Sequence, residues 1–270
     1  GKDRRRDRGP EEERRLGRQV MVDIIDLKDR SMTMLKKDLI LRNPLRQMGY
    51  EDDDIIPAGG FGAVLARAGV GKTALLVQFA LNTMLRGKRV LHVGLHDPVN
   101  KVDLWYRELF RHLAVQYQVG QIRTLWEEIL PLRFIMTFKV EGFSVPRLRE
   151  RLNDLTAQGI FYPDTIIIDG LIFDDFPQSA LADMKSMIEE LSLRAWFTVH
   201  VHRQVQADAD GIPKPLLPAD DLFDVALLLV TEGNEMHIRD LKSERTPSPH
   251  PVLILDPATM LIKENVAVAS

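Results

Sequence analysis

Residues 65 to 76 read LARAGVGKTALL, with a Gly-Lys-Thr triplet at the start of a segment that has the apolar spacing of a helix. The backbone N–H groups of such a turn can wrap a phosphate, and the positive end of the following helix adds to the attraction. Lys72 can reach the outer phosphates and the Thr73 hydroxyl can ligate magnesium. The predicted phosphate-binding residues are Ala66, Arg67, Ala68, Gly69, Val70, Gly71, Lys72, Thr73 and Ala74. ATP and Mg²⁺ are the expected cofactors.

The first loop position usually holds glycine, and this chain has Ala66 there. A small side chain is tolerated at that position if its φ angle stays negative. The motif therefore remains a phosphate loop, provided that a strand precedes it and a helix follows.

A magnesium ion at such a loop also needs a carboxylate, which normally ends an apolar strand. Residues 164 to 171, DTIIIDGL, supply Asp169 after four apolar or β-branched residues, and we expect its strand to adjoin the loop strand. An ordinary polar turn residue is the alternative for Asp169. Because Gly170 follows, this motif carries no glutamate to activate water.

The chain beyond Phe61 alternates short β-rich runs with longer helical patterns, which is typical of βαβ units in a mostly parallel sheet flanked by helices. The predicted strands are 61–66, 89–95, 132–138, 164–169 and 195–201. The predicted helices are about 72–86, 99–117, 145–158 and 177–193. After Ala219, three runs at 225–232, 235–242 and 251–256 lie too close together for crossover helices, so they predict an antiparallel C-terminal extension.

The composition excludes several kinds of function but does not identify one. Cysteine is absent from the 270 residues, which excludes disulfides and thiolate chemistry and favours a cytoplasmic protein. No apolar run is long enough to span a membrane, and the net charge of −3 gives no overall attraction to nucleic acid. We expect a charged flexible arm at 1–19, a helical N-terminal extension at 20–43 and an ATPase domain at 44–270.

The segment ARAGVGKTALLVQFALNTMLRGKRVLHVGL resembles the RecA-type ATPase domain of DnaB replicative helicases and the related KaiC and RadA proteins. In the DnaB branch the loop commonly begins Ala-Arg, as Ala66 and Arg67 do here. The resemblance covers about residues 45 to 263. It implies a RecA-like P-loop NTPase fold, ATP with Mg²⁺, and a homo-oligomer such as a hexameric ring.

The catalytic positions depart from that family. The glutamate that polarises water in the family corresponds to His96, beside Asp97, so hydrolysis is expected to be slow or lost. His200 occupies the γ-phosphate sensor position; with His202 it is alternatively half of a metal pair that lacks an evident third ligand. The family's Lys-x-Arg finger, which enters the neighbouring subunit, corresponds to Lys242 and Arg245, one residue further apart. Ordinary polar surface roles stay open for all of these residues.

Relatives bind single-stranded nucleic acid through the loops after the Asp169 and His200 strands. Here these loops contain six aspartates (Asp174, Asp175, Asp208, Asp210, Asp220 and Asp221) and one lysine, Lys214, so they would repel phosphate backbones. The sequence therefore predicts a weak Mg-dependent ATPase that acts in an oligomer, on an unknown protein client or, less favoured by the acidic loops, weakly on nucleic acid. A nucleotide-dependent binding or signalling module that does not hydrolyse ATP is the alternative. A DNA helicase or recombinase is the least favoured reading.

Overall fold

The computed structural model describes residues 55–202, 212–242 and 251–263, with isolated residues and a short helical stretch (21, 32–37, 39–40, 46, 48 and 50) before them. The chain divides into two units, Gly1–Asp38 and Leu39–Ser270. Residues 32–37 are helical, within the predicted extension, whereas the predicted arm at 1–19 lies outside the described residues. None of the described helices is both long and apolar enough to cross a lipid bilayer.

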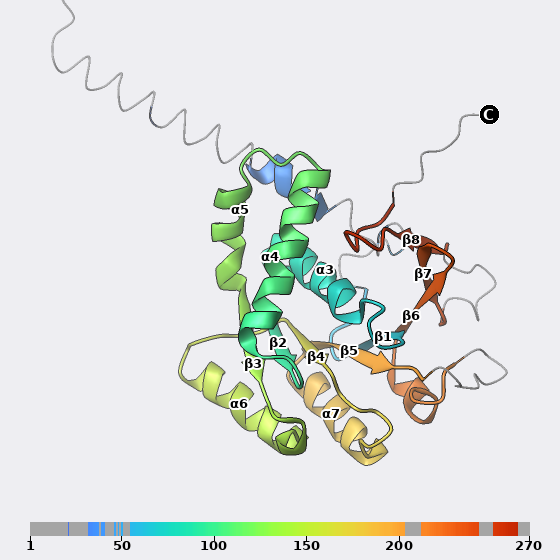
Figure 1. The fold of residues 1–270 in the computed structure, drawn as a ribbon. Coiled ribbons are helices and arrows are strands. Elements are labelled where there is room, and N and C mark those ends of the chain that lie inside the picture. Colours follow the sequence, from blue (N-terminus) through green and yellow to red (C-terminus); the bar gives the residue numbers. More distant parts are fainter. Residues whose placement is uncertain are drawn as a thin grey trace, which may run out of the picture. The chain divides into compact units, whose positions relative to one another are not determined.

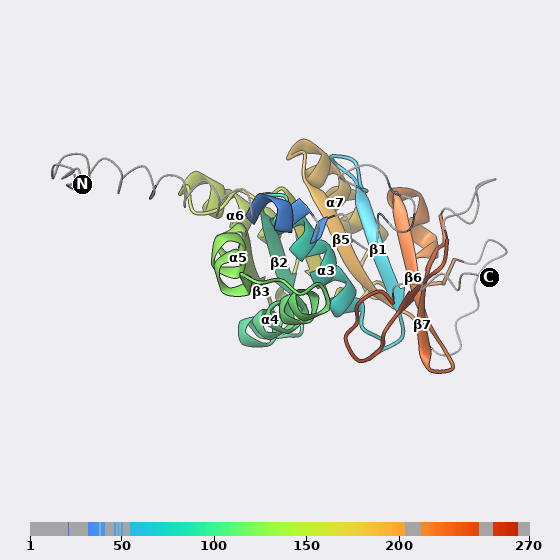
Figure 2. The same cartoon turned by 90° about the horizontal axis from the view of Figure 1, so that it is seen from above.

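The second unit is built on one mixed sheet, whose strands in the described residues run in the order β3-β2-β4-β5-β1-β6-β7-β8. Figure 2 shows β2, β5, β1, β6 and β7 of this sheet side by side. Their bounds are β1 Phe61–Ala66, β2 Val90–Gly94, β3 Arg133–Thr137, β4 Thr165–Asp169, β5 Arg194–His200, β6 Val225–Glu232, β7 Glu235–Asp240 and β8 Leu253–Leu255. The strands from β3 to β6 pair in parallel, and β7 and β8 are antiparallel. An α/β fold with a mostly parallel sheet is therefore confirmed.

Helices cover both faces of this sheet (Figure 1). α3 (Lys72–Leu85), α4 (Val99–Gln116) and α5 (Ile122–Ile129) lie on one side, and α6 (Val145–Ala157) and α7 (Gln178–Glu190) on the other. The central strands are mostly apolar because both faces are covered, and every residue of β1 is buried. Helix α3 is buried almost all round, which explains its nearly continuous apolar sequence.

Three details differ from the sequence predictions. Helix α5 was not predicted, although Ile122, Leu125, Trp126 and Ile129 have helical spacing and Leu125 and Ile129 are buried. Strand β6 was expected in the antiparallel extension, but it pairs in parallel with β1. The connection from His200 to Val225 is long enough to let β6 run in the same direction as β1. Strand β7 pairs antiparallel with β6 and β8 pairs antiparallel with β7, so among the described strands only β7 runs opposite to the rest.

The third difference concerns Asp169. Its strand, β4, was expected next to the loop strand, β1, but β5 lies between them and pairs with both. Parallel strands bring their carboxyl ends to one edge, so Ala66, Asp169 and His200 still end neighbouring strands there. The start of α3, rather than strand pairing, must therefore bridge the loop and the carboxylate.

Candidate functional site

The loop from Ala66 to Thr73, here called the Gly-rich loop, connects β1 to α3. It turns through Gly69 and Gly71, whose φ angles are +76° and +102°, and α3 begins at Lys72. Positive φ angles favour glycine, which explains two of the motif residues. Ala66 is not among the described non-glycine residues with positive φ, as the sequence reading required.

The Lys72 ammonium is folded back over the Gly-rich loop. Its Nζ donates hydrogen bonds to the carbonyl oxygens of Ala66 and Arg67, at 3.0 Å each. Burial lowers the pKa of Lys72, while the negative charge of Asp169 opposes that shift. The cation therefore lies between the loop and the carboxylate, at the position where a phosphate would offer it stronger acceptors.

Asp169 is held by two threonine hydroxyls. The Thr73 hydroxyl donates to Oδ2 at 2.7 Å, and the Thr198 hydroxyl donates to Oδ1 at 2.8 Å. Thr198 also accepts a hydrogen bond from the Gly170 N–H at 2.8 Å, which ties β5 to the turn after β4. Burial would raise the pKa of Asp169, but the nearby His92 ring and the two hydroxyls hold it below its usual range. The carboxylate is thus charged and fixed in orientation beside Thr73.

A buried histidine lies behind this carboxylate. His92, in the middle of β2, is fully buried, and its Nε2 is 3.8 Å from Oδ2 of Asp169. Its Nδ1 is 3.1 Å from the hydroxyl of Tyr106, a fully buried residue of α4. Three elements, β2, β4 and α4, therefore converge beneath Asp169.

His96 and Asp97 lie in the turn between β2 and α4. The His96 ring lies against Gly170, where an added Cβ would be 2.5 Å from His96 Cδ2, and the φ angle of Gly170 is +97°. A side chain at position 170 would thus clash with this ring as well as strain the backbone. The Asp97 carboxylate accepts a hydrogen bond from Lys101 at 2.8 Å. His96 is therefore brought beside the turn after Asp169, whereas Asp97 is paired with Lys101 in the first turn of α4.

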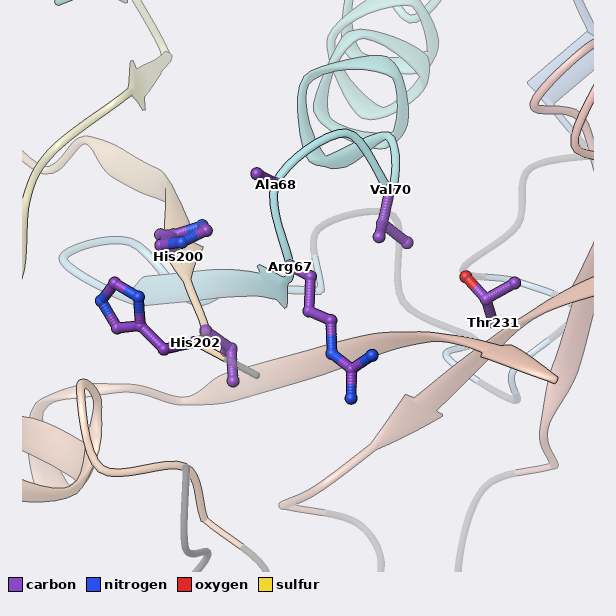
Figure 3. Close-up of a pocket in the computed structure, with 7 residues that line it drawn as sticks. Arg67, Ala68, Val70, His200, His202 and Thr231 are labelled. Carbon is purple, nitrogen blue, oxygen red and sulfur yellow. The ribbon is translucent and has the colours of Figure 1, made fainter. Parts of the chain in front are cut away.

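His200 and His202 lie beside the Gly-rich loop, in a cavity of about 450 Å³ (Figure 3). Arg67, Ala68 and Val70 of the loop line this cavity, with Thr231 of β6 opposite the histidines. The rings of His200 and His202 are 4.7 Å apart, and His202 Nε2 is 3.3 Å from Oδ2 of Asp174. Partial desolvation, with the nearby Lys72 and His202, lowers the pKa of His200 against the opposing charge of Asp174, so its imidazole is mainly neutral at pH 7.

The metal-pair alternative for these histidines gains no third ligand. In the part of the chain that the structure describes, no three His, Asp or Glu side chains are grouped as a metal cluster. His200 ends β5, while His202 lies beyond it rather than on the same strand face.

Lys242 does not extend freely from the molecule. Its Nζ is 2.8 Å from Oδ1 of Asp220 and donates to the Asp220 carbonyl at 2.7 Å. In the single chain a carboxylate of the same chain holds the Lys242 ammonium, and the role of Lys242 in a neighbouring subunit stays a prediction. Arg245, with Asp208 and Asp210, lies outside the described residues.

A C-terminal turn contacts the Gly-rich loop. Met260 adopts a φ angle of +61°, and its methyl carbon would be 2.1 Å from a Cβ added at Gly71. The Gln78 amide donates to the Met260 carbonyl, and the Met260 N–H donates to Asp256 at 2.7 Å. The turn after β8 therefore packs against the Gly-rich loop at Gly71.

Sequence reasoning missed several residues around the site, namely His92, Tyr106, Thr198 and Met260. His92 and Thr198 did carry a signal, since each is a polar residue inside an otherwise apolar strand. Tyr106 and Met260 carried none that spacing could reveal. Their roles depend on how α4 and the C-terminal turn pack.

Comparisons with known proteins add nothing to this geometry. No protein-family model matches the chain, and a search of curated proteins found no match.

Proposed function

We propose that this chain is a Mg-dependent ATP-binding protein of the P-loop NTPase class with a RecA-like core. The observation that carries the proposal is the 2.7 Å hydrogen bond between Thr73 and Asp169, which lie 96 residues apart in the sequence. A hydroxyl at the start of a helix beside a charged carboxylate, with a lysine next to both, fits the Mg-phosphate chemistry of this class.

The residue types suit the expected ligands. Magnesium usually keeps several waters and takes only one or two protein ligands in addition to phosphate oxygens. Thr73 and Asp169 supply two oxygen ligands, and the Gly-rich loop and Lys72 would hold the phosphates. These side chains would bind the nucleotide and orient its terminal phosphate toward the edge where His96 and His200 lie.

The experiment is a calorimetric titration with ATP and Mg²⁺ of the wild-type protein and Lys72→Ala. The variant should lose ATP binding, because it lacks the charge that reaches the outer phosphates, but it should stay folded. Lys214→Ala is the matched control, since Lys214 is an exposed lysine beyond β5. Unchanged ATP affinity in Lys72→Ala would refute the proposal.

Hydrolysis is proposed to be slow. The neutral imidazole of His200 and the ring of His96 are the groups beside the site that can exchange a proton, and Asp97 is already paired with Lys101. The same arrangement favours the second candidate, a module that binds ATP without hydrolysing it. Single-turnover hydrolysis with and without Mg²⁺ separates the two functions, because only the ATPase releases phosphate above the rate of the Lys72→Ala variant.

We also propose that the ATPase works as a homo-oligomer on a protein client. With Lys242 paired to Asp220, Arg245 is the remaining candidate for a residue that acts in a neighbouring site. Mixing Lys72→Ala with Arg245→Ala protein should then recover hydrolysis, since a mixed interface pairs an intact loop with an intact arginine. Full activity of a demonstrably monomeric sample would contradict this part of the proposal.

A further inference from the structure

His92 is a buried polar side chain that the proposed nucleotide site leaves unexplained. It is fully buried, and its Nε2 has no hydrogen-bond partner among the described residues, although it faces Oδ2 of Asp169 at 3.8 Å. A buried donor without an acceptor is costly, so a buried imidazole at this position calls for a reason. An apolar residue would fill the middle of β2 without that cost.

Tyr106 determines which nitrogen of His92 carries the proton. Burial raises the pKa of the Tyr106 phenol far above neutrality, so the hydroxyl keeps its proton and can donate to Nδ1, 3.1 Å away. A neutral imidazole that accepts at Nδ1 carries its proton on Nε2. The guanidinium of Arg133 packs over the Tyr106 ring, 4.5 Å from its centre. The Nε2–H group is therefore directed at the Asp169 carboxylate.

The distance explains how this group could act. At 3.8 Å, Nε2 lies just outside hydrogen-bonding range of Oδ2, while Thr73 already donates to the same oxygen. Closing this short gap would let the Nε2–H donate to Oδ2. Groups that hydrogen-bond a metal-ligating side chain orient it, and their loss typically weakens metal affinity by about 10–100-fold.

We propose that His92 is a positioning residue, whose Nε2–H holds the Asp169 carboxylate in the orientation that presents it to magnesium; the inference rests on the proposed function. His92 does not touch the nucleotide itself. Its contribution should therefore appear only in the part of the ATP affinity that depends on Mg²⁺.

The test compares ATP affinity with Mg²⁺ and with EDTA, by calorimetry, for the wild type and for His92→Phe, His92→Gln and Tyr106→Phe. Phenylalanine fills the space but lacks the donor, so the gain in affinity on adding Mg²⁺ should fall by about 10–100-fold, with Mg-free binding unchanged. Glutamine offers an amide N–H near the position of Nε2 and should restore most of the gain. Tyr106→Phe removes the hydroxyl that fixes the proton of His92 on Nε2. This variant should therefore lose part of the gain in ATP affinity on adding Mg²⁺.

His237→Phe is the matched control. His237 is a half-buried histidine of β7 that pairs with Glu232 and Glu235 in the antiparallel part of the sheet, and its loss should leave the Mg²⁺ gain unchanged. A full Mg²⁺ gain in His92→Phe would overturn the inference. Equal losses with and without Mg²⁺ in both His92 variants would do the same, because they indicate a purely structural role.

Two further outcomes are decided by the same titrations. If His92→Phe does not fold, a retained gain in His92→Gln together with a reduced gain in Tyr106→Phe supports the inference, and wild-type behaviour of both overturns it. If the wild type binds ATP equally with and without Mg²⁺, or not at all, the proposed function fails and this inference fails with it. A wild type with a clear Mg²⁺ gain that His92→Phe shares refutes only the role of His92.

Discussion

The two sides of the Gly-rich loop differ in how firmly their side chains are held. On the proposed magnesium side, Asp169 is fixed by the hydroxyls of Thr73 and Thr198 and backed by buried His92. On the proposed γ-phosphate side, His96 and His200 are exposed, and His202 contacts the similarly exposed Asp174. Preorganised groups bind well, whereas rate acceleration needs groups fixed at the reacting atoms. The comparison suggests strong Mg-nucleotide binding with poor turnover.

The largest expected effect comes from placing a carboxylate on the proposed γ-phosphate side of the loop. His96→Glu should raise the single-turnover hydrolysis rate, because a positioned general base typically contributes on the order of 10²–10⁴-fold. His200→Glu, at the other exposed histidine, serves as the comparison. A lower rate in His96→Glu would instead make the imidazole a working part of the site.

On the proposed magnesium side, Asp169→Asn should weaken Mg²⁺-dependent ATP binding. The amide keeps the shape but loses the charge, so the gain in ATP affinity on adding Mg²⁺ should fall by at least about 10–100-fold. Calorimetric titration with Mg²⁺ and with EDTA measures this gain. Equal weakening in both conditions would show that Asp169 has a structural role only.

Thr198→Val should weaken the link between β5 and the turn after β4. The valine is similar in shape, but the part-buried Gly170 N–H and Oδ1 of Asp169 lose their partner, which should cost roughly 1–3 kcal/mol of unfolding free energy. Urea denaturation measures the change. Thr198→Ser, which keeps the hydroxyl, should recover most of it, and full stability in the valine variant would mean that these bonds contribute little.

The smallest expected effect is that of Lys101→Ala. The exposed Lys101–Asp97 pair has i,i+4 helical spacing, and such pairs contribute about 0.3–0.5 kcal/mol. Stability should fall by no more than that, while Asp97 is released beside His96. Hydrolysis that increases clearly in this variant would show that Asp97 can serve the site once it is unpaired.

The sequence could predict features that depend on neighbouring residues, but not those that depend on tertiary packing. Periodicity placed nearly every strand and helix, and the Gly-Lys-Thr motif located the loop, because both depend on local chemistry. The insertion of β5 between β1 and β4 could not be predicted, since strand order depends on how βαβ units pack. The pairing of Lys242 with Asp220 could not be predicted for a similar reason, because it joins the turn after β7 to a short 3₁₀ helix 22 residues earlier.

Polar residues within apolar strands were the signal left unused. His92 and Thr198 stand in strands that are otherwise apolar near their centres, and both contact or face Asp169. A buried polar residue requires a partner, so each could have been expected to face a functional group. The partner itself depends on sheet register, which the sequence does not specify.

The most direct test of the account is a double-mutant cycle between Thr73 and Asp169. Thr73→Val, Asp169→Asn and the combined variant would be titrated with ATP in Mg²⁺ and in EDTA. Side chains that ligate one cation together should be strongly non-additive, so the combined variant should lose little more Mg²⁺ gain than either single variant. Additive losses, or a wild type that does not bind ATP, would contradict a shared magnesium site at the Gly-rich loop.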